Sequence, residues 1–290
     1  MMKIALFGTG LMGAPMAERL KAAGHEVMVF NRTREKVLPL AEKGIHLARD
    51  PAEAVAFADW IVLMLADFPA ISQTLLTGDH DFSSKNIIQM GTIASTESRQ
   101  LQQTFEASGA VYLECPVLGS RNEARNGTLI LMAGGAKEQF EKAEGLLKIF
   151  GPEPKYIGPV GSAATLKLSL NQLIASLAVC FSFSLGLVER SRIDVDLFMS
   201  ILKKSALFAP MFEKKLPNMR DRRYDDPNFP ARHLLKDVKL VIGESGDKGL
   251  PPAHLDAVRN ILEEVMKKGI GDGDYSCLYE VVNPRSRDTS

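Results

Sequence analysis

The sequence predicts an α/β protein in which a doubly wound parallel sheet is followed by an all-α C-terminal domain led by a long central helix. Three observations carry this prediction. A short apolar run, residues 4–7, leads directly into the pattern Gly8-x-Gly10-x-x-Gly13. Apolar runs and helical patterns then alternate along the first half of the chain, which is typical of parallel sheets covered by helices. Beyond Gly161 only helical patterns remain.

The glycine pattern lies inside one predicted βαβ unit. The helical run 14–23 follows it and ends at Gly24, and residues 26–30 form the next apolar strand. A strand, a glycine-rich turn, a helix and a second strand are the context that a dinucleotide-binding turn requires. We therefore predict a Rossmann fold whose turn binds the cofactor through Gly8, Thr9, Gly10, Leu11 and Met12.

Each glycine has its own physical role in such a turn. Gly8 permits the tight bend, Gly10 lets the backbone approach a pyrophosphate, and Gly13 lets the helix pack close to the strand. The helix that follows offers free N–H groups and a partial positive charge to the phosphates. A purely structural glycine turn is the alternative, but the strands on both sides favour a cofactor site.

The later elements of the first domain follow from the same periodicities. Residues 60–65 are continuously apolar, the pattern of a strand that is buried on both faces. Pro51 suits the first turn of a short helix. Further strands are expected at 44–48, 59–65, 86–90, 111–114, 127–133 and 155–157, and helices at 51–58, 69–76, 95–107 and 136–150.

The second domain is expected to contain helices only. We place the boundary near Gly161, which gives a dinucleotide-binding domain over 1–161 and a helical domain over 162–290. The polar tail 283–290 is expected to fray. The predicted helices are 162–190, 194–204, 210–219, 232–246 and 252–268.

The stretch 168–188 allows two interpretations. It carries no charge and is long enough to span a bilayer. It also contains Asn171, Gln172 and several serines, and it is a single segment in the middle of the chain, so we favour a central helix that is apolar on all sides. A small domain rarely buries such a helix completely, and we expect part of it to pack against a second subunit in a homodimer or homotetramer.

Composition argues against several classes of function. The 290 residues carry 35 basic and 35 acidic side chains, so nothing favours binding to nucleic acid or to an anionic membrane. Cys115, Cys180 and Cys277 are far apart and lack metal-ligand spacing, which indicates a reducing compartment and no metal site. The apolar run near the N-terminus is too short for a secretory signal. We expect a cytoplasmic protein.

The end of the second strand predicts the cofactor. NAD-binding folds usually place Asp or Glu there, where the carboxylate binds the ribose hydroxyls. Here Asn31 holds that position, and Arg32-Thr33-Arg34 follows. Because a guanidinium suits a 2′-phosphate, we predict NADP(H) in preference to NAD(H), bound through Asn31, Arg32 and Thr33. The alternative is a solvated basic loop.

The start of the long helix contains the candidate catalytic residues. Lys167 and Asn171 are four residues apart, so they share one face of the helix. A lysine that opens an apolar helix beside a cleft can be partly desolvated and can donate a proton to a carbonyl oxygen. Asn171 would hold the lysine or the substrate oxygen. The alternative is an ordinary lysine at a helix start, where lysine is common.

These motifs together resemble the β-hydroxyacid dehydrogenases, which include 3-hydroxyisobutyrate dehydrogenases, tartronate semialdehyde reductases and glyoxylate/succinic semialdehyde reductases. The resemblance covers nearly the whole chain, and several ordered motifs are more specific than any one of them. It rests on Gly8-x-Gly10-x-Met12-Gly13 with Met16-Ala17, Gly24-His25-x-Val27, Asn31-Arg32-Thr33, Pro116-Val117-Leu118-Gly119-Ser120 with Gly127-Thr128-Leu129, the helix 161–171, and Lys236-Asp237-Val238-x-Leu240.

The resemblance implies a role for each matching residue. Lys167 is similar to the family's catalytic lysine, and Asn171 to its partner in the substrate site. Gly119 and Ser120 lie in the loop that binds the substrate carboxylate. The resemblance also implies that the helical domain completes the substrate site and builds the oligomer. Further implied contacts are Thr92 and Lys236 at the nicotinamide end, Phe229 in the same pocket, and Leu65 and Ala66 at the adenosine ribose.

The substrate loop departs from the family pattern at one position. The family commonly reads Pro-Val-Ser-Gly-Gly, whereas this chain reads Pro116-Val117-Leu118-Gly119-Ser120. Leu118 stands where a hydroxyl is usual, and Ser120 brings a hydroxyl two residues later. Either Ser120 supplies the hydrogen bond to the substrate, or the pocket is more apolar and the substrate differs.

The expected activity is hydride transfer between NADP(H) and a small β-hydroxyacid or aldehyde acid, with Lys167 as proton donor or acceptor. Glyoxylate, succinic semialdehyde and 3-hydroxyisobutyrate are such substrates. One alternative is an imine reductase-like enzyme, although those relatives usually replace the lysine. The other is a non-catalytic nucleotide-binding module that serves oligomerisation; Lys167, Asn171 and Lys236 together argue against it.

Overall fold

The computed structural model describes residues 1–285 and divides into two compact units. The first unit is Met1–Leu168, and the second begins at Ser169. The division falls inside one continuous helix, α8 (Ser162–Arg190), so Lys167 belongs to the first unit and Asn171 to the second. Of the tail predicted to fray, residues 286–290 lie outside the described part of the chain.

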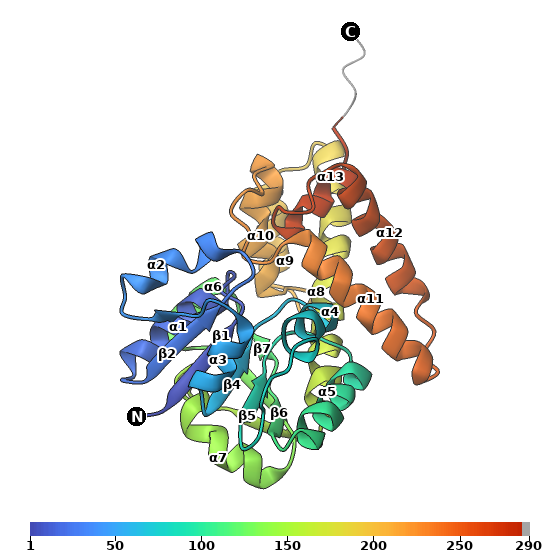
Figure 1. Cartoon of the computed structure of the whole chain (residues 1–290). Coiled ribbons are helices and arrows are strands. Elements are labelled where there is room, and N and C mark those ends of the chain that lie inside the picture. The colour runs from blue at the N-terminus through green and yellow to red at the C-terminus, as the bar shows by residue number, and fades with distance from the viewer. Residues whose placement is uncertain (286–290) are drawn as a thin grey trace. The chain divides into compact units, whose positions relative to one another are not determined.

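The first unit is built on one sheet, which in the described residues has nine strands. Six strands are parallel in the order β3-β2-β1-β4-β5-β6 (Figure 1). From β1 the strands are added first towards one edge of the sheet, as β2 and β3, and then towards the other, as β4, β5 and β6. This change of side between β1 and β4 is that of a doubly wound fold, so the predicted fold is confirmed. β8 continues the sheet antiparallel to β6, and β7 and β9 pair with β8. The strands are β1 (Lys3–Phe7), β2 (Glu26–Phe30), β3 (His46–Leu47), β4 (Trp60–Leu63), β5 (Asn86–Gln89), β6 (Val111–Glu114), β7 (Val117–Leu118), β8 (Ile130–Gly134) and β9 (Lys155–Gly158).

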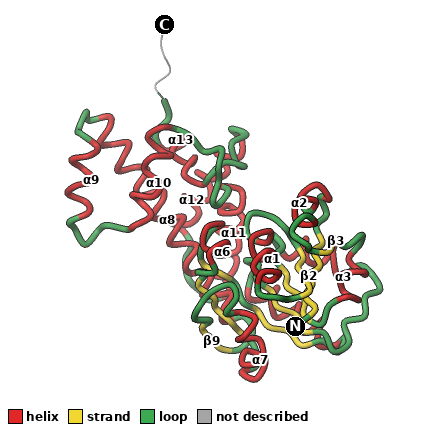
Figure 2. Tube along the Cα trace, turned by 90° about the vertical axis from the view of Figure 1, so that its left-hand side faces the viewer, coloured by secondary structure: helices red, strands yellow, loops and turns green. Residues whose placement is uncertain are grey.

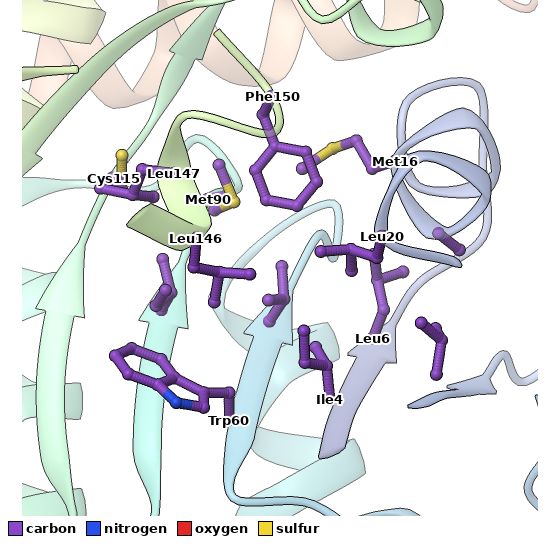
Figure 3. Close-up of a cluster of buried hydrophobic side chains, with 14 of the residues drawn as sticks. Ile4, Leu6, Met16, Leu20, Trp60, Met90, Cys115, Leu146, Leu147 and Phe150 are labelled. Atoms are coloured by element: carbon purple, nitrogen blue, oxygen red, sulfur yellow. The ribbon is translucent and has the colours of Figure 1, made fainter. Parts of the chain in front are cut away.

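Successive strand residues enter two separate cores, one on each face of the sheet. Leu6 packs in the first core and Phe7 in the second. In the first core, Leu6 lies with Leu20 of α1 and with Leu146 of α7 (Figure 3). Each such fully buried side chain contributes about 1.5–3 kcal/mol to folding. The first face carries α1 (Gly13–Ala22), α6 (Arg121–Asn126) and α7 (Lys137–Leu147), and the second carries α3 (Pro51–Phe57), α4 (Phe68–Ile71) and α5 (Ser95–Ala107).

The first unit differs from the prediction in its short elements. The helix expected at 69–76 is α-helical only over α4 and continues as a π-helix, Ser72–Leu76. The strand expected at 127–133 begins only at Ile130, because Gly127 ends α6 in a left-handed conformation with φ 69°. A two-residue strand or a helix of only one or two turns spans too few residues to show a clear period. The elements missed for this reason are the 3-10 turn Arg34–Lys36, α2 (Leu38–Ala41), β7 and α6.

The second unit is built from helices, as predicted. Ala175 and Ala178 of α8 form one core with Leu234 of α11 and Leu262 of α12, and α11 and α12 lie side by side (Figure 1). A second core joins α8 to α9 and α10 (Figure 2), where the rings of Phe181 and Phe212 stack at 4.7 Å. The helices after α8 are α9 (Val195–Lys203), α10 (Pro210–Asp221), α11 (Ala231–Asp247), α12 (Ala253–Lys267), the 3-10 turn Tyr275–Leu278 and α13 (Tyr279–Val282).

Helix α8 supplies both a buried and an exposed apolar surface. Among the described residues it is the one helix that is long and apolar enough to cross a membrane by length and composition. This is a weak indication, because the central helices of globular proteins pass the same test. Here Ala178 and Leu185 are fully buried in the helical cores, whereas Phe183 and Leu187 are 65% and 60% exposed. The predicted central helix therefore leaves an uncovered apolar strip.

Candidate dinucleotide and substrate site

The glycine turn between β1 and α1 is shaped by packing at two of its three glycines. Gly8 has φ 93°, and a Cβ on it would lie 2.4 Å from the carbonyl oxygen of Met64. A Cβ on Gly13 would lie 1.8 Å from the carbonyl oxygen of Gly8. A Cβ on Gly10 would meet no atom of the described chain within 4 Å. Packing requires Gly8 and Gly13, whereas Gly10 fits the close approach of a dinucleotide pyrophosphate.

Asn31 joins the loop after β2 to this turn. Its Oδ1 accepts a hydrogen bond from the backbone N–H of Thr9 at 3.2 Å, and its Nδ2 donates to the carbonyl oxygen of Thr33 at 2.9 Å. Arg32, Thr33 and Arg34 are exposed beyond it. The Thr9 hydroxyl is buried and has no hydrogen-bond partner in the described chain. The turn thus combines a buried polar group with an exposed basic loop, which fits a phosphate-bearing ligand.

The segments after β4 and β5 lie at the same edge of the sheet as the glycine turn, because the carboxyl ends of parallel strands share one edge. They are in close contact, since a Cβ on Gly91 would lie 2.3 Å from the carbonyl oxygen of Leu65. Ala66 is exposed, and Leu65 and Thr92 are half-buried. The fold therefore gathers the predicted cofactor residues of the first unit along the edge where doubly wound folds bind their ligands.

The predicted substrate loop is organised by Glu123. Leu118 pairs with Ile130 in the β7–β8 ladder. The backbone N–H of Ser120 donates to Oε2 of Glu123 at 2.8 Å, and the Ser120 hydroxyl donates to the same oxygen. Gly119 has φ 140°, a backbone conformation that a side chain would strain. The loop is therefore a formed structure at the start of α6, and the Ser120 hydroxyl has an internal partner.

The predicted catalytic lysine lies near the start of α8 and is largely buried. Lys167 is 8% exposed, and its neighbours Ala164 and Leu168 are buried as well. A lysine ammonium in such surroundings is partly stripped of water. The geometry meets one requirement for a proton donor, namely shielding of the group from bulk solvent.

Asn171, Asp237 and Lys236 form one polar cluster in the second unit, in which Asn171 and Asp237 are buried and Lys236 is half-buried. Asn171 Nδ2 donates to Asp237 Oδ2 at 2.6 Å, and Lys236 Nζ forms an ion pair with Asp237 Oδ1 at 2.8 Å. Asn171 and Asp237 are both 2% exposed. Asn171 Oδ1 is buried and has no partner in the described chain. Asp237 thereby fixes the amide so that its oxygen is left as an acceptor.

Phe229 is held by the segment that follows α12. The backbone N–H of Tyr275 donates to the carbonyl oxygen of Phe229 at 2.9 Å, and the two rings meet edge to face at 6.0 Å. The neighbouring Asp274 is fully buried and pairs with Lys215 at 2.7 Å. Phe229 is therefore half-buried on a rigid backbone just before α11.

The predicted residues fall into two groups, one in each unit. Sequence reasoning missed two buried acids that hold them: Asp237, which binds Asn171 and Lys236, and Glu114, which binds the first turn of α8. Glu114 could have been suspected because it is a charged residue that ends an apolar strand. Within residues 1–285, no group of three or more His, Cys, Asp or Glu side chains is placed to hold a metal ion.

Comparisons with known proteins agree with this architecture. Residues 3–158 match the family described as the NAD binding domain of 6-phosphogluconate dehydrogenase, and residues 161–282 match the NAD-binding domain of NADP-dependent 3-hydroxyisobutyrate dehydrogenase. Two proteins of Arabidopsis thaliana are similar over almost the whole chain. The chloroplastic glyoxylate/succinic semialdehyde reductase 2 is 33% identical, covering 96% of this chain and 79% of the relative. Glyoxylate/succinic semialdehyde reductase 1 is 30% identical, covering 97% and 98%.

Solved structures share the fold. The 3-hydroxyisobutyrate dehydrogenase of Mycobacterium tuberculosis, solved with L-serine, superposes with a TM-score of 0.84. The match covers 97% of this chain and 99% of that one, at 22% sequence identity. At this identity the likeness concerns the fold alone, and the sequence matches above carry the family relationship.

Proposed function

This chain belongs to the β-hydroxyacid dehydrogenase family, and on that premise we propose that it is an NADP(H)-dependent reductase of small aldehyde acids. An oxidoreductase that uses a nicotinamide dinucleotide is what the family relationship supports directly. The preference for NADP(H), the substrate class and the residues in their roles are our proposal. The observation that carries it is the largely buried Lys167 near the start of α8, four residues before an asparagine whose amide Asp237 orients.

The first unit holds the cofactor through the glycine turn and the basic loop. Backbone N–H groups at Gly10 and at the start of α1 bind the pyrophosphate. The exposed Arg32 and Thr33 bind the 2′-phosphate through charge-assisted hydrogen bonds. Leu65 and Ala66 would contact the adenosine ribose, and Thr92 would contact the nicotinamide end. Lys236 of the second unit is the further nicotinamide contact that the family resemblance implies.

The reduction adds a hydride and a proton to a carbonyl group. NADPH, when bound at the glycine turn, would be the source of the hydride for the carbonyl carbon. Lys167 Nζ donates a proton to the carbonyl oxygen as negative charge builds there, which gives the hydroxyl, and the amine then recovers a proton from water. Asn171 Oδ1, which has no partner in the described chain, would accept a hydrogen bond from the hydroxyl as it forms and so help to orient the substrate.

The substrate is oriented through its carboxylate. The Gly119–Ser120 segment would bind the carboxylate, and Glu123 holds the N–H and hydroxyl of Ser120 so that the segment keeps its shape. Phe229 would add apolar surface to the pocket. Leu118 replaces the hydroxyl that relatives commonly carry, so this pocket favours substrates with an apolar segment next to the carboxylate. Orientation through a non-reacting group of the substrate lowers the entropic cost of the reaction.

A cofactor-oxidation screen tests the proposal. Purified protein is mixed with NADPH or NADH and with glyoxylate, succinic semialdehyde, tartronate semialdehyde or methylmalonate semialdehyde, and absorbance loss of the reduced cofactor is followed. We expect turnover with at least one aldehyde acid and a higher kcat/KM with NADPH than with NADH. Tight NADPH binding without turnover of any carbonyl would instead identify a nucleotide-binding module. A parallel reaction contains a ketone together with an amine, and turnover in that reaction alone would identify an imine reductase.

The same proposal includes the setting of the enzyme. We infer a homodimer or homotetramer, because the exposed apolar strip of α8 needs a partner surface. We also infer a cytoplasmic enzyme, because none of the three cysteines is disulfide-bonded: Cys115 and Cys277 are buried and Cys180 is exposed, which suits a reducing compartment.

A further inference from the structure

Glu114 holds the first turn of α8. It ends β6 and is 1% exposed. Its Oε1 accepts hydrogen bonds from the backbone N–H groups of Gly161 at 2.8 Å, Ala163 at 2.8 Å and Ala164 at 3.2 Å. The first backbone N–H groups of a helix have no partner inside the helix. A single carboxyl oxygen from a strand 47 to 50 residues earlier satisfies three of these groups.

The Glu114 carboxyl is itself held in place. Its Oε2 accepts a hydrogen bond from the Ser98 hydroxyl at 2.5 Å, and the Ser98 and Tyr112 hydroxyls lie 2.9 Å apart. Ser98 and Tyr112 are fully buried. Gly134 faces Glu114 across the β6–β8 pair, and a Cβ on it would lie 2.5 Å from Oε1. The carboxyl is therefore fixed between three elements: Ser98 of α5, Gly134 of β8 and the first turn of α8.

Burial and hydrogen bonding act on this carboxyl in opposite directions. Burial is the larger effect and raises the pKa of Glu114 above its ordinary value, while the hydrogen bonds from Ser98 and from the amides of Gly161, Ala163 and Ala164 offset part of the rise. An acid in such a place is costly to bury unless its hydrogen bonds are made. Four donors meet the two oxygens here, so the sheet retains a buried acid whose partners are mainly the backbone of one helical turn.

The position of this turn decides where Lys167 lies. Lys167 follows Ala164 by three residues on the same rigid helix, so a shift of the first turn moves the lysine with it. A proton donor must stand within hydrogen-bond reach of the reacting oxygen, and misplacement by about 1 Å can cost on the order of 100-fold in rate. The hydrogen bonds of Glu114 described above go to Ser98 and to the start of α8. None of these partners is a residue that we assign to the dinucleotide.

We propose that Glu114 is a positioning residue for the reduction: through the backbone of the first α8 turn it sets the place of Lys167 against the substrate oxygen. The inference rests on the proposed function, since it assigns a task to the site where that reaction occurs. It differs from a general stabilising role because it predicts a loss in the chemical step without a loss in cofactor affinity.

The test compares Glu114→Ala and Glu114→Gln with wild-type protein, using NADPH and the aldehyde acid that the wild type turns over best. Glu114→Ala removes the acceptor from all three amides. We expect kcat to fall at least tenfold, while the Kd of NADPH, measured by fluorescence, stays within twofold. The isotope effect on kcat with NADPH deuterated at the transferred position should rise. Glu114→Gln keeps an amide oxygen that can accept from the helix amides. Its log kcat should recover at least a third of the difference between Glu114→Ala and the wild type.

A matched control removes a helix cap elsewhere in the same unit. Asp50 accepts a hydrogen bond from the backbone N–H of Glu53 at 2.8 Å at the start of α3. Asp50→Ala should lower stability without changing kcat or the isotope effect. Should Glu114→Ala fail to fold, Glu114→Gln and Gly134→Ala carry the test. The added Cβ in Gly134→Ala must displace the Glu114 carboxyl, so kcat should again fall while NADPH still binds.

Three outcomes overturn the inference. A folded Glu114→Ala with wild-type kcat shows that the turn needs no anchor, and a parallel loss of kcat and NADPH affinity shows a general structural role. Hydrogen exchange of residues 161–167 gives a readout that needs no activity: it should accelerate at least tenfold in Glu114→Ala, and wild-type exchange rates overturn the anchor. If the wild-type protein turns over no substrate, the proposed function is contradicted. The contact of Glu114 with the first turn of α8 is then tested by hydrogen exchange alone.

Discussion

Asn171 on α8 and Asp237 on α11 are joined by a hydrogen bond of 2.6 Å from the amide nitrogen to the carboxylate. Both side chains are almost completely buried. A carboxylate can only accept hydrogen bonds, so the bond fixes which end of the amide faces Asp237. The amide oxygen is consequently left as a buried acceptor on the same helix face as Lys167.

This relationship predicts the effect of Asp237→Asn. The new amide can donate as well as accept, so Asn171 is no longer held in one orientation, and Lys236 loses its ion-pair partner. We expect kcat to fall roughly tenfold, less than the approximately 100-fold that misplacing a catalytic group by about 1 Å can cost. Steady-state kinetics and NADPH titration measure it. An unchanged kcat in Asp237→Asn would show that the orientation of Asn171 has no part in catalysis.

Lys167→Ala removes the proposed proton donor. General acid catalysis contributes about 10²–10⁴-fold, so kcat should fall at least 100-fold. The Kd of NADPH should change only a few fold, because the glycine turn and the basic loop hold most of the cofactor. Asn171→Ala should lose less than Lys167→Ala. Near-normal turnover in Lys167→Ala contradicts the mechanism, and complete loss of NADPH binding marks Lys167 as structural.

Arg32→Ala tests cofactor choice. A charge-assisted hydrogen bond is worth roughly 1.5–3 kcal/mol, so the wild type should favour NADPH over NADH at least tenfold in kcat/KM. Arg32→Ala should reduce this preference at least tenfold and leave the NADH value unchanged. Lys148→Ala, which removes an exposed charge just after the end of α7, is the control. Equal use of both cofactors by the wild type, or an unchanged preference in Arg32→Ala, would falsify the proposal.

Leu118→Ser restores the hydroxyl that relatives commonly carry in the substrate loop. If Leu118 narrows the carboxylate pocket, the ranking of aldehyde acids by kcat/KM should change, because one apolar group in a pocket is worth about 1–3 kcal/mol of discrimination. Its partner across the β7–β8 ladder, Ile130, is 53% exposed, and Ile130→Ser serves as the control. An identical ranking in Leu118→Ser would mean that its side chain does not face the substrate.

The exposed strip of α8 predicts self-association. Phe183→Glu places a charge on the strip and should shift the protein to monomers in light scattering at micromolar concentration. Lys148→Glu, just after the end of α7, should leave the oligomer intact. A wild-type monomer under the same conditions rules out the interface, and a requirement for detergent would favour the membrane interpretation of α8 instead.

The parts of the site that were predictable depend on short-range physics. The glycine turn is visible because three glycines, a strand and a helix must follow each other within a few residues. A further local signal was overlooked: Ser120-x-x-Glu123 followed by Gly127 is the signature of a short capped helix, and α6 lies there.

The missing parts depend on contacts between distant residues. Asn171 and Asp237 are 66 residues apart, and Glu114 lies 47 to 50 residues from its partners in α8. Neither spacing follows from periodicity, because only the packing of complete elements decides which buried acid meets which donor. The motif that contains Lys236 and Asp237 is visible in the sequence. What the sequence does not show is that Asp237 also binds Asn171 of the long helix.

The three glycines of the β1–α1 turn are not equivalent as targets for mutation. Gly8→Ala and Gly13→Ala force a methyl group into backbone carbonyl oxygens, so these variants disturb folding and cofactor binding at once. In Gly10→Ala the methyl group meets no atom of the described chain within 4 Å, and the backbone needs no rearrangement. Gly10→Ala therefore separates folding from cofactor binding: it should have the melting temperature of the wild type but lose affinity for the dinucleotide. It supplies a folded reference protein that does not bind the hydride donor.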